Sequence, residues 1–221
     1  MELKSAWSYS ALTAFETCPR RYYLTRVSKE VKEPQTDATI WGNKVHKALE
    51  LFAKGEKPLP PDLQEYGRYV RKFLDREGKR VVEEKVALDK NLRPTKWFAK
   101  DVWVRGVIDL GVVGSERAYL LDWKTGKRKP DSDQLKLFAA LAFAKYPWID
   151  SAVTGFVWLK EKKFDKEVFT RDQVTEIWGE FLPRLSRLAE SYEQDRWVPK
   201  PSGLCRNWCP VGQKLCEFCG T

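Results

Sequence analysis

The chain has 221 residues, which is room for one large domain, or a domain with a small satellite, and for a substantial buried core. It has 40 lysines and arginines against 31 aspartates and glutamates, a formal net charge of +9, and its hydrophobic fraction of 43% excludes wholesale disorder. The 32% of charged residues, and a longest apolar run of only Leu137 to Ala144, exclude a membrane protein.

No apolar stretch follows the opening residues Met1 to Ser5, so we expect no signal peptide and a cytoplasmic protein. From the charge alone, two hypotheses are equally good: the protein binds a nucleic acid, or it has no particular polyanionic partner. One cysteine is Cys18, and the other four lie between Cys205 and Cys219. In a cytosolic protein, such a cluster indicates a metal site rather than a disulfide framework.

Apolar residues recur at helical spacing in the first part of the chain. The pattern predicts a helix over about 8–26, capped by Ser8 or Ser10 and broken at Pro19. A second helix is predicted over 36–53 and a third over about 63–77, with a proline-rich stretch between them.

The period then changes to that of strands, which are predicted over 80–88, 102–113 and 118–124. A helix over 133–145, strands over 152–159 and 165–170, and a long amphipathic helix over 174–192 follow. The tail from Trp197 is loop-like and rich in proline, glycine and cysteine. This order predicts one α/β domain in which helices pack on a mixed sheet.

The sharpest motif is Asp122-Trp123-Lys124 at the end of a predicted strand, with Asp109 in the strand before it. If the two strands pair, Asp109 and Asp122 come side by side, and their repulsion is relieved when they share a divalent cation. Strand alternation places Lys124 on the face of Asp122, where it could stabilise charge on a phosphate or orient a water. For the tripeptide alone, an ion pair on a surface strand is the commoner explanation.

Four further residues extend this pattern. His46, the only histidine, lies one helical turn after Gly42, and it is either a metal ligand or an ordinary core or surface residue. Gln134 falls in the first turn of a helix, where it could reach a phosphate. Alternation places Glu83 and Glu84 on opposite faces, so either could face the site, or both could be solvated.

In this order, the motifs resemble the RecB-like branch of the PD-(D/E)XK nucleases. The resemblance runs from about residue 8 to the C-terminus. It rests on Ser10-Ala-Leu12…Cys18-Pro19-Arg20, Gly42…His46, Glu83 or Glu84, Gly106-x-x-Asp109, Asp122-x-Lys124-Thr-Gly126, Gln134 and the cysteine-rich tail. It implies a restriction-endonuclease-like α/β core, with a mixed sheet flanked by helices.

The resemblance also implies a division of the chain. We expect one nuclease domain over 1–221, with an N-terminal helical part over about 8–78 and a nuclease core over about 80–192. The cysteine-rich tail, about 197–221, is expected to close on Cys18.

In the family, the matching residues imply metal-dependent hydrolysis. His46, Asp109 and Asp122 are expected to bind Mg²⁺ or Mn²⁺ with the carbonyl of Trp123, and Lys124 is expected to assist cleavage of a phosphodiester. The candidate catalytic residues are Lys124, Asp109, Asp122, Glu83, Glu84 and Gln134. Family members often carry Gln-x-x-x-Tyr in the next helix, but this chain has Phe138, which lacks the hydroxyl.

The implied activity is that of a DNA exonuclease in recombination, replication or phage DNA processing. Its substrate would be single-stranded DNA or duplex ends, and the protein could be phage-encoded. A structure-specific or nicking endonuclease is the alternative within the nucleases. A DNA-binding or assembly module that keeps the fold without activity is the alternative outside them.

The family includes an iron–sulfur subgroup, shared by the CRISPR-associated RecB-like nucleases and the AddB helicase-nuclease. In that subgroup, one cysteine before the core and three after it hold a [4Fe–4S] cluster. The cysteines that fit are Cys18, Cys205, Cys209 and Cys216, with Cys219 as a spare thiol or a substitute for Cys216. The alternative is a structural Zn²⁺ held by the four tail cysteines alone.

Aromatic and basic residues near these motifs suggest contacts with DNA. Trp41, Trp97 and Trp123 could stack on unpaired bases. The basic run Lys127-Arg128-Lys129 follows Lys124. A solvated surface is the simpler explanation, but we favour a track for a phosphate backbone.

Overall fold

The computed structural model describes residues 3, 5–129 and 133–220. Met1, Glu2 and Lys4, part of the opening segment considered for a signal peptide, lie outside these residues. The chain divides into two compact units: a terminal unit, Met1–Gln35 with Gly179–Thr221, and a central unit, Thr36–Trp178. The expected division into an N-terminal helical part, a nuclease core and a cysteine-rich tail of one nuclease domain stays a prediction.

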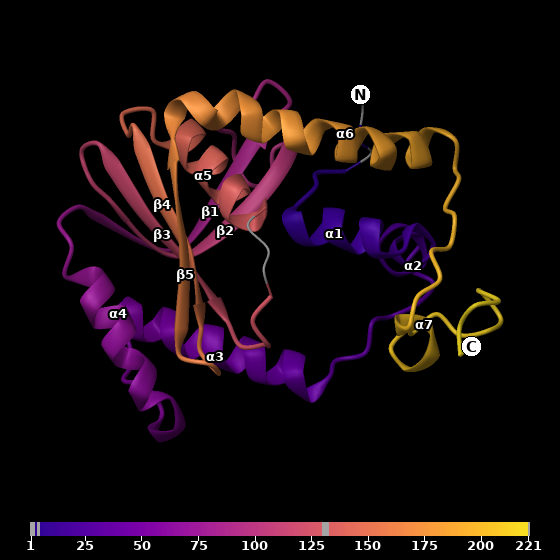
Figure 1. Cartoon of the computed structure of the whole chain (residues 1–221), viewed down its shortest axis with the longest axis horizontal. Coiled ribbons are helices and arrows are strands. Elements are labelled where there is room, and N and C mark those ends of the chain that lie inside the picture. The colour runs from indigo at the N-terminus through magenta and orange to yellow at the C-terminus, as the bar shows by residue number, and fades with distance from the viewer. Residues whose placement is uncertain (1–2, 4, 130–132, 221) are drawn as a thin grey trace. The chain divides into compact units, whose positions relative to one another are not determined.

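The central unit is built on a five-stranded mixed sheet in the order β1-β2-β3-β4-β5 (Figure 1). Neighbouring strands are antiparallel except for β3 and β4, which run parallel. The strands are β1 (Lys79–Asp89), β2 (Val102–Val113), β3 (Arg117–Lys124), β4 (Ser151–Trp158) and β5 (Lys163–Thr170). The predicted α/β class with a mixed sheet is confirmed.

The parallel pair needs a crossover, which α5 (Asp133–Lys145) supplies. Eight of its residues are buried, from Leu135 to Phe143, and the apolar side chains surround the helix instead of forming one stripe. A helix that is apolar on all sides is stable only when it is enclosed. The crossover is therefore part of the core.

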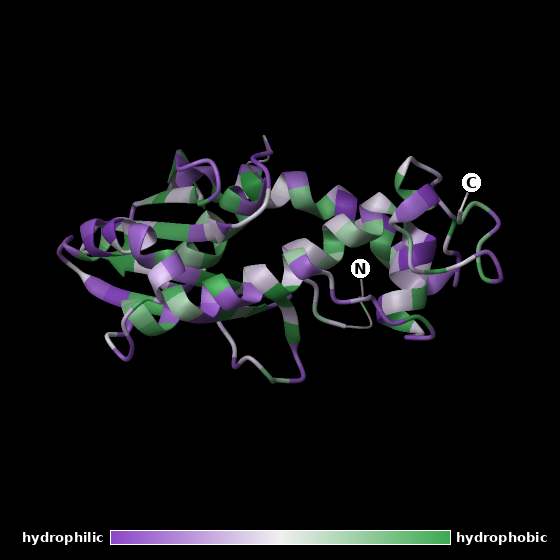
Figure 2. Cartoon of the chain, turned by 90° about the horizontal axis from the view of Figure 1, so that it is seen from below, coloured by the Kyte–Doolittle hydropathy of each residue, from purple (hydrophilic) through white to green (hydrophobic). Residues whose placement is uncertain are grey.

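Two helices of the central unit pack on the sheet through one apolar cluster. Thr36 caps α3 (Asp37–Ala53) by accepting the Thr39 backbone N–H at 3.2 Å. The segment predicted as a helix over 63–77 is a 3₁₀ helix, Pro61–Tyr66, followed by α4 (Gly67–Leu74). The buried residues that join these helices to the sheet are Val45, Leu49, Leu63, Val70, Leu110, Val112, Leu121 and Trp123. Figure 2 shows hydrophobic residues along the strands and alternating hydrophobic and hydrophilic residues along the helices.

The terminal unit begins with α1 (Tyr9–Thr17) and α2 (Pro19–Tyr22), which a π-helix (Tyr23–Val27) continues. Ser8 is the cap, because its hydroxyl accepts the Ala11 backbone N–H at 3.3 Å. The predicted break falls at Cys18, whose extended backbone separates the helices, and Pro19 occupies the first position of α2.

Aromatic residues from the two ends of the chain form the core of the terminal unit. The helix α6 (Val174–Glu193) begins in the central unit and enters the terminal unit at Gly179. The buried cluster contains Phe15, Tyr22, Leu188, Tyr192 and Trp197. The tail beyond it is irregular except for the short α7 (Leu204–Asn207).

Among the described helices, none is both long and apolar enough to cross a bilayer.

Two glycine substitutions have opposite expected effects on stability. One tests close packing in the sheet, and the other tests the helix propensity of α6. A Cβ at Gly155 would lie 2.8 Å from the backbone oxygen of Asp165, so Gly155→Ala should destabilise the protein by about 1–3 kcal/mol. No atom of the described residues lies within 4 Å of a Cβ at Gly179 in α6, so Gly179→Ala should stabilise the protein by about 0.5–1 kcal/mol. Urea denaturation measures both, and a Gly155→Ala variant as stable as the wild type would contradict the register of β4 and β5.

Candidate metal centre and catalytic site

The candidate site forms where β2 and β3 separate. Their pairing ends at Leu110 and Leu121, and the next residues at this end are Asp109 and Asp122. Both aspartates are buried, and Asp109 Oδ2 accepts the backbone N–H of Trp123 at 2.8 Å. The side chain of Asp109 thus takes the place of a backbone partner where the ladder stops.

His46 reaches this position from α3. Its Nδ1 lies 3.3 Å from Asp109 Oδ2, and its hydrogen bond with the backbone of Trp123 places it against β3. One turn earlier, a Cβ at Gly42 would lie 3.2 Å from Thr125 Oγ1. Glycine at this position therefore lets α3 approach the end of β3 closely, which brings the imidazole to the aspartate.

The backbone of Glu83 decides which glutamate faces the site. Glu83 has a φ of +51°, and the pairing passes from Val82–Leu110 to Glu84–Ile108 without including it. Strict alternation is broken there, so Val82 packs with the cluster under α3 while Glu83 approaches His46 on the same helix. Donor atoms of His46, Glu83 and Asp109 all lie within 4.8 Å of one another.

Glu84 has different partners. It forms an ion pair with Lys145 at the end of α5, and its Oε1 is 3.5 Å from the hydroxyl of Tyr146. Its carboxylate is therefore committed to α5, away from His46. Of the two candidate glutamates, the structure places Glu83 beside the histidine.

The acidic groups at the site perturb one another's pKa values. Burial, together with the charge of Asp109, raises the pKa of Asp122 to about 6. The pKa of Glu83 is raised for the same two reasons. Burial lowers the pKa of His46, but its hydrogen bond to Asp109 and the charges of both aspartates outweigh burial and leave the pKa raised.

These shifts reveal more negative charge than the surrounding groups neutralise. A divalent cation would relieve that excess, and a donor set made mainly of carboxylate oxygens suits Mg²⁺ or Mn²⁺. The oxygen Asp122 Oδ2 is buried, and the ammonium of Lys124, 2.7 Å away, offsets only part of the negative charge at the site. The residues present fit a divalent cation.

Lys124 is held in a closed set of polar contacts. Its Nζ donates to Gln134 Oε1 at 2.7 Å, and Gln134 Nε2 donates to Asp122 Oδ1 at 3.0 Å. The ammonium also lies 4.7 Å from the ring centroid of Phe156. The predicted placement of Lys124 and Asp122 on one face is confirmed, and Gln134 contacts both. The role of Phe156 had no sequence signal, because β4 meets β3 only in the folded sheet.

Two residues expected to contact DNA have other roles in the structure. Arg128 binds Asp165 through both carboxylate oxygens, at 2.7 and 2.5 Å, and Asp165 also accepts the indole N–H of Trp158 at 2.7 Å. Arg128 thus secures the loop after β3 to the β4–β5 hairpin, and it is not free for a phosphate track. The prediction that Trp123 stacks on a base is wrong, because its side chain is buried in the core and only 3% exposed.

In the terminal unit, all five cysteines line one small pocket. Cys18 comes from the segment before α2, and the other four come from the tail. Backbone N–H groups point at three of the sulfurs: Lys200 at Cys18 (3.5 Å), Ser202 at Cys205 (3.4 Å) and Gly212 at Cys219 (3.2 Å). The structure therefore brings Cys18 to the tail cysteines.

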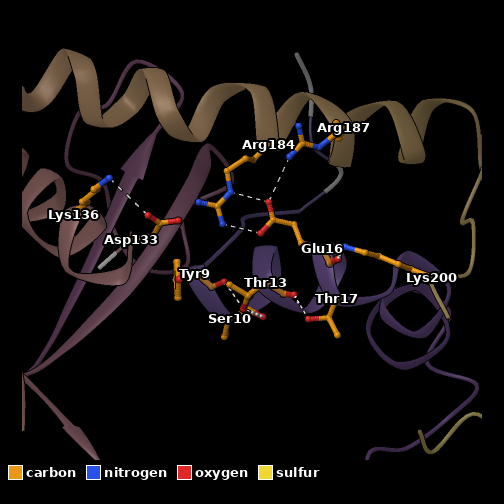
Figure 3. Close-up of polar contacts among 10 residues, drawn as sticks. All are labelled: Tyr9, Ser10, Thr13, Glu16, Thr17, Asp133, Lys136, Arg184, Arg187 and Lys200. Atoms are coloured by element: carbon orange, nitrogen blue, oxygen red, sulfur yellow. Dashed lines mark hydrogen bonds and ion pairs between the residues drawn. The ribbon is translucent and has the colours of Figure 1, made fainter. Parts of the chain in front are cut away.

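Polar contacts hold the chain beside Cys18 in place (Figure 3). Arg184 binds Glu16 through two contacts of 2.7 Å, with Arg187 3.7 Å from the same carboxylate. The ammonium of Lys200 donates to the backbone oxygen of Glu16 at 2.8 Å. Because Lys200 contacts both Glu16 and Cys18, the segment after α6 is tied to the end of α1.

Comparison with protein families matches residues 6–217 to the PD-(D/E)XK nuclease superfamily. No curated protein sequence matches the chain significantly. Among solved structures, the protein SSO0001 is similar with a TM-score of 0.52 and 16% identity, over 96% of this chain and 85% of that one. A protein described as a putative exonuclease, from Eubacterium rectale, has a TM-score of 0.54 and 11% identity, over 95% and 92% of the two chains. At these identities, the structural matches show a shared fold.

The geometry predicts how carboxylate substitutions change Mn²⁺ binding. Asp109→Asn and Glu83→Gln should each weaken it by about tenfold or more, because each removes a charged donor from the centre. Glu84→Gln is the matched control and should stay within about twofold of the wild type, because Glu84 pairs with Lys145. Isothermal titration calorimetry measures all three. Equal losses for the two glutamates would contradict the placement of Glu83.

Proposed function

The chain belongs to the PD-(D/E)XK nuclease superfamily, and on that premise we propose that it is a metal-dependent DNA nuclease that hydrolyses phosphodiester bonds. One observation carries the proposal. His46, Glu83 and Asp109 offer three donor atoms within 4.8 Å, beside the ion pair of Asp122 and Lys124. If Asp122 and Lys124 formed only a structural ion pair on a surface strand, the further acidic groups gathered beside them would have no explanation.

The residues that would hold Mg²⁺ or Mn²⁺ are His46, Glu83, Asp109 and Asp122, with the carbonyl of Trp123. When bound, such an ion activates water and neutralises charge that develops on a phosphate. The chain itself supplies a fixed cation. Gln134, Asp122 and Phe156 hold the ammonium of Lys124 at the end of β3, so it can orient a water or stabilise an anionic phosphate without reorganising.

We propose exonuclease activity on single-stranded DNA or duplex ends, in recombination, replication or phage DNA processing within the cytoplasm. The similarity in fold to a protein described as a putative exonuclease supports this choice. A structure-specific or nicking endonuclease would use the same residues, and it would differ by cutting circular DNA. A module without activity would have no need of a lysine held by three neighbours.

Removal of the side chain of either Asp122 or Lys124 should abolish cleavage. Asp122→Ala and Lys124→Ala should each reduce the rate by about 100-fold or more, since each removes charge stabilisation from the transition state. The assay uses end-labelled single and double strands and a closed circle, with Mn²⁺ present. Lys166→Ala, which changes an exposed lysine on β5, should cleave as the wild type does. Near-normal cleavage by either of the first two variants would refute the site.

We also propose that Cys18, Cys205, Cys209 and Cys216 hold a [4Fe–4S] cluster, with Cys219 as the alternative to Cys216. The inclusion of Cys18 in the pocket supports this. A zinc knuckle of the four tail cysteines would leave the presence of Cys18 in this pocket unexplained, whereas a centre that includes Cys18 accounts for it.

The variant Cys18→Ala distinguishes a [4Fe–4S] cluster that includes Cys18 from a zinc site made of the tail cysteines alone. Anaerobically purified wild type should be brown and contain iron, and the variant should be pale and less stable, because the loss of this ligand unties the two ends of the chain. Iron analysis, visible absorbance and thermal unfolding measure the effect. Thr17→Ala is the control for the end of α1, since the Thr17 hydroxyl donates to the backbone oxygen of Thr13 in the same helix. A colourless wild type with one zinc, unaffected by Cys18→Ala, would overturn the cluster and leave the nuclease site untouched.

A further inference from the structure

A cavity lies beside the candidate metal centre within the central unit. Its volume is about 460 Å³, within the range of about 300–1,000 Å³ that small-molecule sites occupy. The side chains that define it are Trp41, Tyr66, Thr125, Leu159, Lys160 and Lys162, and we call it the Trp41 cavity.

The Trp41 cavity and the metal centre share α3. Trp41 and Val45 line the cavity, Gly42 lies against Thr125 in its wall, and His46, one turn after Gly42, contacts Asp109 in the centre. Successive residues of a helix are rotated by about 100°, so these two pairs form neighbouring stripes along one helix. An occupant of the cavity would therefore lie against the turn of helix that carries His46.

They also share the end of β3. Thr125, in the cavity wall, directly follows Lys124, and the backbone N–H of Leu159 donates to the oxygen of Lys124 at 2.9 Å. The wall of the cavity thus continues from the strand that presents the lysine. The two sites are therefore arranged so that neighbouring groups of one polymer chain would occupy them.

The cavity combines an aromatic plane with cations. Trp41 is 40% exposed, and Lys44 lies 5.1 Å from its ring centroid while paired with Asp62 at 2.9 Å, which steadies the indole. Lys162 pairs with Glu65 at 2.7 Å. Among the described residues, Lys160 forms no ion pair, so its charge is available to an anion.

These features fit an unpaired nucleotide. A base can stack on an indole only when the face of the base is free. In a duplex, the neighbouring base pairs cover that face. A lysine without an ion-pair partner among the described residues, beside the aromatic plane, suits the attached phosphate. An uncharged apolar ligand would leave that lysine without a role.

We propose that the Trp41 cavity receives an unpaired base of the DNA substrate, next to the phosphate at the metal centre. This inference rests on the proposed nuclease function and gives it a substrate class. The protein binds single-stranded DNA, or a single-stranded end, in preference to a blunt duplex. A duplex must open by at least one nucleotide before it fits.

Binding measured without cleavage tests the proposal. Fluorescence anisotropy with a labelled single-stranded oligonucleotide and a blunt duplex, in EDTA, separates binding from metal-dependent chemistry. Trp41→Ala should weaken binding of the single strand by about 5- to 150-fold, which is what one lost stacking contact costs, and should change duplex binding by less than about twofold. Trp41→Phe should restore most of the affinity, because it restores an aromatic face.

The control is Trp148→Ala. Trp148 is also exposed, at 52%, but its indole bonds Gly114 O in the turn between β2 and β3, at the opposite end of β3 from Lys124. This variant should bind both DNAs as the wild type does. Thermal unfolding of each variant checks that the fold is intact.

The outcomes distinguish this inference from the function on which it rests. Unchanged binding by Trp41→Ala, or equal losses for single strand and duplex, would overturn the base subsite, whereas the nuclease proposal would stand if Asp122→Ala still abolished cleavage. A wild type that neither binds nor cleaves DNA would overturn both.

Discussion

Buried negative charge is the constraint on which the centre of this protein depends. Asp109 and Asp122 meet where two strands separate, and Glu83 approaches from the neighbouring strand. Asp109 makes both Asp122 and Glu83 harder to ionise, and the described residues that contact the two aspartates include the imidazole of His46 and the ammonium of Lys124. The structure tolerates this arrangement through a backbone N–H to Asp109 and a lysine fixed beside Asp122. Such an arrangement is stable at neutral pH when a divalent cation completes it.

One helix connects the elements around that charge. The glycine at position 42 allows α3 to approach the end of β3, and the same approach fixes His46 against Asp109 and Trp41 over the adjoining cavity. Apolar contacts of Val45 and Leu49 hold the helix on the sheet. The proposed metal ligation and the proposed base recognition thus depend on the same packing, so a substitution that displaces α3 from the sheet is expected to impair both.

Local patterns along the chain determine the architecture of this protein. The strand and helix periods from residue 36 to the end of α6 predict the observed elements to within a few residues, because apolar alternation directly encodes which face is buried. The segment near residue 63 is an exception, where a 3₁₀ helix precedes α4. The adjacency of Asp109 and Asp122 and the shared face of Lys124 also follow from the period and order of the strands.

Only the tertiary structure decided which groups those elements bring together. A single left-handed residue, Glu83, breaks the alternation, so the rule that separates it from Glu84 could not say which one meets His46. Arg128 has the sequence context of a phosphate ligand, but Asp165, from a later strand, engages it. Cys18 meets the tail cysteines through packing of the two chain ends. The sequence by itself determined elements and motifs, because these depend on neighbours along the chain, whereas pairings between distant segments depend on the whole packed structure.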